Sequence, residues 1–238
     1  GGLCGAGQSL LQPEHIVALI EASGAKILVA LGPHPALDIW QKAVAIRDQV
    51  PGLTLVRVLP PGTSEEEGAV EFGPALMSQL DDRLTFGEAG RGDGVAAYFH
   101  TGDTTGAPKL VAHTHRGQLV SAFDGAVLGN YRADAVLTAT LLLFHVAGTI
   151  CTGLSAFMAG LELVVMSRAG MRSPAIVEGF WRLAAQHNAI LVGGVPTGVG
   201  AVLEVLVDDA DISSVRAGLT GAALLPPAVG ERFCQVTG

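Results

Sequence analysis

Charged and aromatic residues are scarce in this sequence of 238 residues. Only 15% of the residues are charged and 5% are aromatic, whereas 49% are hydrophobic. A disordered chain would need the opposite balance, so this composition excludes disorder and favours a globular protein with a large core. Lys and Arg total 14 against 22 Asp and Glu, and no basic cluster stands out. We therefore expect no nucleic-acid partner.

Cysteine is also rare. Cys4, Cys151 and Cys234 are an odd number at wide spacing, which predicts neither a disulfide framework nor a zinc site. We interpret them as reduced thiols, with Cys151 filling part of the core, as suits a cytoplasmic protein. The sequence starts without a methionine or the basic segment of a signal peptide, and we interpret it as part of a longer chain.

One uncharged stretch, residues 135–161, exceeds the roughly 20 residues that a helix needs to cross a bilayer. Its character changes along its length, however. Residues 135–143 are strand-like, 147–159 are helix-like, and 161–166 are strand-like again. This change of period favours a buried β–α–β unit, so we expect no membrane span.

Strand-like and helix-like segments alternate along most of the chain. Strands are predicted at residues 26–31, 53–59, 94–100, 109–112, 136–140, 162–166, 189–193 and 215–220. Helices are predicted at residues 13–22, 35–48, 147–159, 174–187 and 197–206. The polar segment 60–73, with an acidic run at 65–67, is predicted to be a solvated loop. Together these predict an α/β fold with layered parallel sheets and flanking helices.

A loop rich in Gly and Thr lies between two of the predicted strands. It contains Thr101, Gly102, Asp103, Thr104, Thr105 and Gly106, followed by Ala107, Pro108 and Lys109. Its glycines let backbone amides approach an anion, its hydroxyls donate hydrogen bonds, and its lysine adds a positive charge. The spacing is not that of the P-loop of nucleotide triphosphatases, because two residues separate Gly106 from Lys109. The loop is a candidate phosphate site, and a plain surface turn is the alternative.

Residues 101–109 resemble the phosphate-loop signature of the adenylate-forming enzymes, which include the AMP-forming acyl-CoA synthetases. The family pattern is Thr-Ser/Gly-Gly-Thr-Thr-Gly-x-Pro-Lys, and it is matched at Thr101, Gly102, Thr104, Thr105, Gly106, Pro108 and Lys109. The resemblance implies that this loop binds the phosphates of ATP. Asp103 departs from the pattern, which has glycine there, and its carboxylate is expected to weaken nucleotide binding.

Two further strings resemble segments that line the acyl pocket in this family. Residues 141–148 resemble Leu-Pro-Leu-Phe-His-x-x-Gly, which implies that Phe144 and His145 border the pocket and that His145 orients the carboxylate. Taken alone, a histidine in this position is more often a core or capping residue. Residues 193–197 resemble the Val-Pro-Thr segment, which implies that Val195 and Thr197 also line the pocket. A helix start at Pro196 is the alternative interpretation.

The adenine site is implied by a fourth string. Residues 220–227 resemble Ser-Gly-Ala-Ala-Pro-Leu-Pro-Pro, in which Gly221, Ala222 and Ala223 would let the flat base lie against the main chain. His113 and His115 follow the phosphate loop, but no third ligand is apparent, so we interpret them as structural and expect no metal site.

The resemblance also implies the organisation of the chain. Residues 1–115 would form a partial first α/β subdomain that ends in the phosphate loop. Residues 116–238 would form a truncated second one, without the small C-terminal domain that carries the catalytic lysine. Both would belong to the large N-terminal domain of an adenylate-forming enzyme.

The implied activity is that of an ATP-dependent carboxylate–CoA ligase. The implied ligands are ATP, Mg²⁺, CoA and a small-molecule carboxylic acid. A catalytically silent nucleotide- or pyrophosphate-binding module is the alternative, favoured by Asp103.

Overall fold

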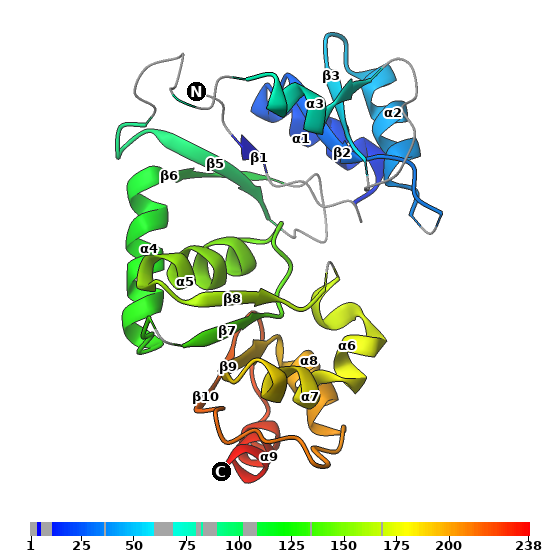
Figure 1. Ribbon diagram of the computed structural model, residues 1–238. Helices are drawn as coiled ribbons and strands as arrows, with labels where there is room; N and C mark the ends of the chain where they lie inside the picture. The colour runs from blue at the N-terminus through cyan, green and yellow to red at the C-terminus, as the bar shows by residue number, and fades with distance from the viewer. Residues whose placement is uncertain are drawn as a thin grey trace. The chain divides into compact units, whose positions relative to one another are not determined.

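The computed structural model describes residues 4–5, 11–35, 37–59, 69–79, 82, 90–101, 109–133, 135–167 and 169–238. Its contacts group into two units, residues 1–115 and 116–238. Figure 1 shows that both units combine sheets with helices. The α/β fold class predicted from the alternation of segments is therefore confirmed.

The first unit contains a parallel sheet in the order β2-β3-β4, formed by Ile27–Leu31, Thr54–Val58 and Val70–Glu71. Helices α1 (Pro13–Ser23) and α2 (Ile39–Gln49) pack on one face of it. Strand β2 was predicted to be buried, but Ile27 and Val29 are exposed on its other face. In the part of the chain that the structure describes, β2 is therefore buried on one face only, although its sequence is apolar throughout.

The prediction of a loop over residues 60–73 is wrong at its end. Val70 and Glu71 form β4 beside β3, and α3 (Phe72–Met77) follows directly. The reason is a tertiary contact, because Glu71 pairs with the buried guanidinium of Arg57 on β3. The acidic run at 65–67 lies outside the described residues.

A second sheet of the first unit has the order β1-β5-β6. Its strands are Cys4–Gly5, Val95–His100 and Leu110–Thr114. Strand β1 is parallel to β5, whereas β5 and β6 are antiparallel and form a hairpin. The two strands predicted on either side of the Gly/Thr loop are thus confirmed as paired neighbours.

The second unit contains a four-stranded parallel sheet in the order β10-β9-β7-β8. Its strands are Val136–Ala139 (β7), Glu162–Val165 (β8), Ala189–Gly194 (β9) and Ala217–Thr220 (β10). Adjacent pairing of β7 and β8 confirms the predicted β–α–β unit over residues 135–166. In the described ranges, no helix is both long and apolar enough to span a bilayer.

Helices cover both faces of this sheet (Figure 1). On one face, Leu137 and Leu191 pack against Ala156 of α5 (Ser155–Ala159). On the other face, Val192 packs against Phe180 and Trp181. The latter two belong to α7 (Phe180–Gln186), and α8 (Pro196–Leu203) and α9 (Pro227–Thr237) complete that layer. Burial on both faces explains why the central strands β7 and β9 are almost continuously apolar in sequence.

The helices of the second unit differ from the prediction in several places. Residues 147–159 form a π-helical segment η1 (Ala147–Leu154) that continues into α5. The predicted helix 174–187 is interrupted at Gly179 and forms α6 (Pro174–Glu178) and α7. Helices α4 (His115–Leu128) and α9 were not predicted at all.

The interpretation of Cys151 as core filler is also wrong. Its side chain is exposed, because it lies on the outer side of η1. The hydroxyls of Thr152 and Ser155 donate to the carbonyls five residues earlier, those of Ala147 and Ile150. These bonds accompany the widened helical turns, which periodicity in the sequence cannot reveal.

Candidate functional site

The ends of the Gly/Thr loop are joined by the β5–β6 hairpin. His100 faces Leu110 in the ladder, and the N–H of Thr101 donates to the carbonyl of Lys109 at 2.9 Å. Thr101 and Lys109 are exposed. The residues between them that the sequence assigned to phosphate binding, namely Gly102, Asp103, Thr104, Thr105 and Gly106, lie outside the described residues. Their roles remain predictions.

The two histidines after this loop make packing contacts. The ring of His113 meets Phe99 edge to face, with 5.0 Å between the ring centroids. The ring of His115 lies against Gly90, where a Cβ atom would come within 2.9 Å of Nε2. Within the ranges that the structure describes, no three His, Cys, Asp or Glu side chains form a group that could hold a metal. These contacts give both histidines a structural role.

The remaining predicted residues follow strands that end at one edge of the second unit's sheet. Strands β7, β9 and β10 are parallel, so their carboxyl ends lie side by side. Ligands of open parallel sheets bind outside this edge. The predicted residues that follow the three strands are Phe144 and His145, Val195 and Thr197, and Gly221, Ala222 and Ala223, respectively.

The loop after β7 is held in a tight turn. The N–H of His145 donates to the carbonyl of Leu142 at 3.0 Å, and the Thr149 hydroxyl donates to the carbonyl of Leu143. Gly148 closes the turn, since a Cβ atom there would lie 2.3 Å from the Leu142 oxygen. The loop therefore depends on a glycine at this position.

The imidazole of His145 is oriented by the start of η1. The N–H of Ala147 points at Nδ1 over 3.1 Å, so Nδ1 accepts this hydrogen bond. A neutral ring then carries its proton on Nε2, which is left as the donor. The residue is exposed at the edge of the sheet. Nδ1 of His145 thus caps the start of η1, while Nε2 has no hydrogen-bond partner among the residues that the structure describes.

The loop after β10 is built from small, exposed residues. Ala222 has a φ of 69°, a left-handed conformation that costs a non-glycine residue roughly 1–2 kcal/mol. Apart from its chain neighbours, no atom of the described residues lies within 4 Å of the place where a Cβ of Gly221 would be. Strain of this kind is concentrated at functional sites. The open surface of Gly221, Ala222 and Ala223 leaves space for a flat group beside the main chain.

The loop after β8 was not among the predicted site segments. Gly170 has a φ of 54°, and a Cβ atom there would lie 2.4 Å from the carbonyl oxygen of Thr140, which follows β7. The next residue, Met171, donates its N–H to the same oxygen at 3.3 Å. This loop therefore crosses the carboxyl end of β7. The sequence offered only one hint, an isolated glycine between a strand and a helix.

A family model described as "AMP-binding enzyme" matches residues 8–238. The chain belongs to this family. This confirms the resemblance that was drawn from the four strings. The match includes both the phosphate-loop segment and the carboxyl edge of the second unit's sheet.

Relatives and solved structures agree with this family. The chain is 31% identical over 234 residues to a marinolic acid–CoA ligase of Pseudoalteromonas sp., covering 96% of this chain and 35% of that protein. The structure of the anthranilate–CoA ligase AuaEII with anthranoyl-AMP matches with a TM-score of 0.82 at 20% identity. It covers 99% of this chain and 43% of that one.

An N-terminal domain is among the structural matches. The inhibitor-bound N-terminal domain of FACL13 from Mycobacterium tuberculosis matches with a TM-score of 0.73 at 23% identity, covering 94% of this chain and 52% of that one. These structural likenesses show the fold, which is that of the N-terminal domain of adenylate-forming enzymes. The chain spans about a third of the length of the marinolic acid–CoA ligase.

Proposed function

We propose that this chain carries the ATP- and acid-binding part of an AMP-forming carboxylate–CoA ligase. The main support is the family match over residues 8–238, together with acid–CoA ligases among the relatives. In this reaction a carboxylate oxygen attacks the α-phosphorus of ATP, and the bond to pyrophosphate breaks. The thiol of CoA then attacks the acyl carbon of the adenylate, and AMP leaves with the bonding electrons.

The chain's own residues would serve mainly to align and to neutralise charge. Thr101 and Lys109, with the loop between them, would bind the β- and γ-phosphates and so stabilise the departing pyrophosphate. His145 would donate from Nε2 to the carboxylate and hold it in line with the α-phosphorus. Gly221, Ala222 and Ala223 would support the adenine, while Phe144, Val195 and Thr197 would contact the acyl group.

Mg²⁺ is part of the proposal through the resemblance alone, because no group of three or more His, Cys, Asp or Glu side chains that could hold a metal occurs among the described residues. A cytoplasmic location is part of the proposal. A silent nucleotide- or pyrophosphate-binding module is the second candidate, and the observation that favours it is the acidic residue at position 103.

Exchange of labelled pyrophosphate into ATP tests the main proposal and the role of Lys109. The complete protein should catalyse exchange when given its acid, and a silent module should not. We expect Lys109→Ala to lower the exchange rate roughly tenfold to a hundredfold, because a charge-assisted hydrogen bond is worth about 1.5–3 kcal/mol. Lys42→Ala is the matched control, since Lys42 forms an ion pair with Asp38 in α2. An equal loss of exchange rate in Lys109→Ala and Lys42→Ala would contradict the assignment of Lys109 to phosphate binding.

Substitution of Asp103 provides a separate prediction. At about 4 Å and an effective dielectric constant near 20, a carboxylate repels a phosphate charge by roughly 4 kcal/mol before screening. We expect Asp103→Gly to tighten ATP binding about tenfold, measured by calorimetry on the complete protein. Asp93→Gly removes a negative charge elsewhere in the same unit and should leave the affinity unchanged. Equal ATP affinities of the wild type and Asp103→Gly would refute the prediction.

A further inference from the structure

The backbone around Met171 is fixed across the end of β7. Met171 donates its N–H to the carbonyl of Thr140, and Gly170 approaches that carbonyl too closely to carry a side chain. The hydroxyl of Ser167 accepts from the N–H of Ala169 and donates to the carbonyl of Gly170, both at 3.1 Å. These contacts fix the backbone of the loop, and the side chain of Met171 packs against the core cluster that contains Val192 and Val199.

That side chain occupies space left by two glycines. Its Sδ atom lies 2.8 Å from where Gly194 would carry a Cβ and 3.0 Å from the same point on Gly198. Gly194 ends β9, and Gly198 lies in the first turn of α8. A side chain at either position would displace the thioether. Methionine is unbranched and polarizable, so it can fill such a space in more than one conformation.

The same space adjoins the predicted acyl-binding segments. Gly194 and Gly198 directly flank Val195 and Thr197 in sequence. On the other side, a Cβ atom on Gly170 would lie 3.6 Å from the Leu142 side chain, two residues before Phe144. Met171 therefore lies between the loop after β7 and the loop after β9, each of which supplies predicted pocket residues.

A buried hydroxyl on the same face of the sheet has no partner among the described residues. Oγ1 of Thr220 is buried without a hydrogen bond. Thr220 is the ladder partner of Gly194, and the side chains of paired residues project from the same face. Buried polar atoms are nearly always hydrogen-bonded, so the Thr220 hydroxyl is an exception, and it lies beside the glycine that Met171 covers.

We propose that Met171 determines specificity by setting how large an acyl group the site accepts. This rests on the proposed function. The thioether forms a movable wall over Gly194 and Gly198, and a longer or bulkier acyl group needs that wall to be displaced or removed. Met171 acts by shape and takes no part in the chemical step.

The test is the acid preference of the complete protein in pyrophosphate exchange. A series of straight-chain saturated acids is compared by kcat/KM in the wild type, Met171→Ala and Met171→Phe. We expect Met171→Ala to raise the ratio of long-acid to short-acid kcat/KM at least about tenfold, and Met171→Phe to lower it similarly. The KM for ATP should stay the same, which a general structural defect would not allow.

Two control variants keep the result interpretable. Met171→Leu nearly conserves volume and should retain the wild-type preference. Met158→Ala removes an exposed methionine from α5 and should also leave it unchanged. If Met171→Ala fails to fold, as judged by its melting temperature, the test uses Met171→Phe and Met171→Leu instead. A lower ratio of long-acid to short-acid kcat/KM in Met171→Phe than in Met171→Leu then supports the proposal, and equal ratios refute it.

Two outcomes would overturn the proposal and are distinguishable. If the wild type catalyses exchange but the folded Met171 variants keep the wild-type acid preference, the role of Met171 is refuted while the proposed function stands. Absence of exchange with every acid, including branched and aromatic ones, would refute the proposed function and this inference with it.

Discussion

Glu71→Ala should destabilise the first unit by about 3 kcal/mol. Its carboxylate accepts from Nε of Arg57 at 2.8 Å, and the Arg57 side chain is only 1% exposed. Removal of one partner of a buried ion pair typically costs 3–5 kcal/mol. The guanidinium also lies 5.5 Å from the Trp40 ring centroid, and this contact offsets only part of the loss.

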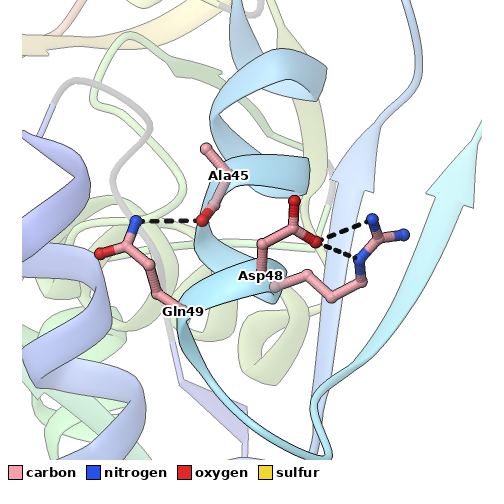
Figure 2. A network of polar contacts seen from close by, with 4 residues as sticks. Ala45, Asp48 and Gln49 are labelled. Carbon is pink, nitrogen blue, oxygen red and sulfur yellow. Dashed lines mark hydrogen bonds and ion pairs between the residues drawn. The ribbon is translucent and has the colours of Figure 1, made fainter.

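An exposed ion pair of the same unit provides the control. Asp48 accepts from Nε and Nη2 of Arg47 at 3.1 and 2.9 Å on the surface of α2, where Gln49 also bonds to the carbonyl of Ala45 (Figure 2). Such pairs contribute about 0–1 kcal/mol. Asp48→Ala should therefore change stability by less than 1 kcal/mol.

Amide hydrogen exchange measures these effects in each unit separately. Protection of β3 should fall in Glu71→Ala, while protection of β9 stays as in the wild type. Adding Arg57→Met to Glu71→Ala removes the buried positive charge as well and should restore part of the protection. Equal protection of β3 in Glu71→Ala and Asp48→Ala would contradict the role assigned to the buried pair.

The sheets could be predicted from sequence because their strands carry the signal locally. Val136–Ala139, Glu162–Val165 and Ala189–Gly194 are apolar runs separated by helix-length segments, and this alternation specifies a parallel sheet. Strand β4 could not be predicted in the same way. Its two residues follow a polar segment, and they join the sheet through Arg57, which lies 14 residues away from Glu71.

Helix α4 illustrates a different failure. Its residues Leu119, Val120, Phe123 and Val127 are exposed, and Ala122 is its buried residue. The helix packs through small residues instead, since a Cβ on Gly125 would lie 2.5 Å from the hydroxyl of Ser155. Without an apolar stripe that faces the core, periodicity gave no signal.

The candidate site could be predicted from sequence where its residues lie in short contiguous motifs. The loops after β7, β9 and β10 each contain one, and the structure places them at one edge of the sheet. The contribution of Met171 is different, because it depends on two glycines that are 23 and 27 residues later in the sequence. Only the packed structure brings Met171 against Gly194 and Gly198.

Gly148→Ala should disrupt the loop that carries Phe144 and His145. The added Cβ would lie 2.3 Å from the oxygen and 2.7 Å from the carbon of the Leu142 carbonyl, so no side-chain rotation can relieve the overlap. Overpacking costs typically 1–3 kcal/mol, and a backbone obstacle places this variant at about 3 kcal/mol. Because His145 bonds to the same carbonyl, we also expect pyrophosphate exchange to fall with the loss of its orientation.

Gly200→Ala separates this overlap from the general effect of replacing a glycine by alanine. Gly200 lies within α8, and among the described residues no atom beyond its chain neighbours and its own helix backbone lies within 4 Å of the position of an added Cβ. Alanine in a helix interior is favoured over glycine, so this variant should be stabilised by about 0.5–1 kcal/mol and should exchange pyrophosphate normally. If denaturant unfolding shows that Gly148→Ala lowers the free energy of unfolding and Gly200→Ala raises it, the turn after β7 requires glycine. A Gly148→Ala protein as stable and active as Gly200→Ala would mean that the Leu142 carbonyl can move away, and that the orientation of His145 does not depend on this turn.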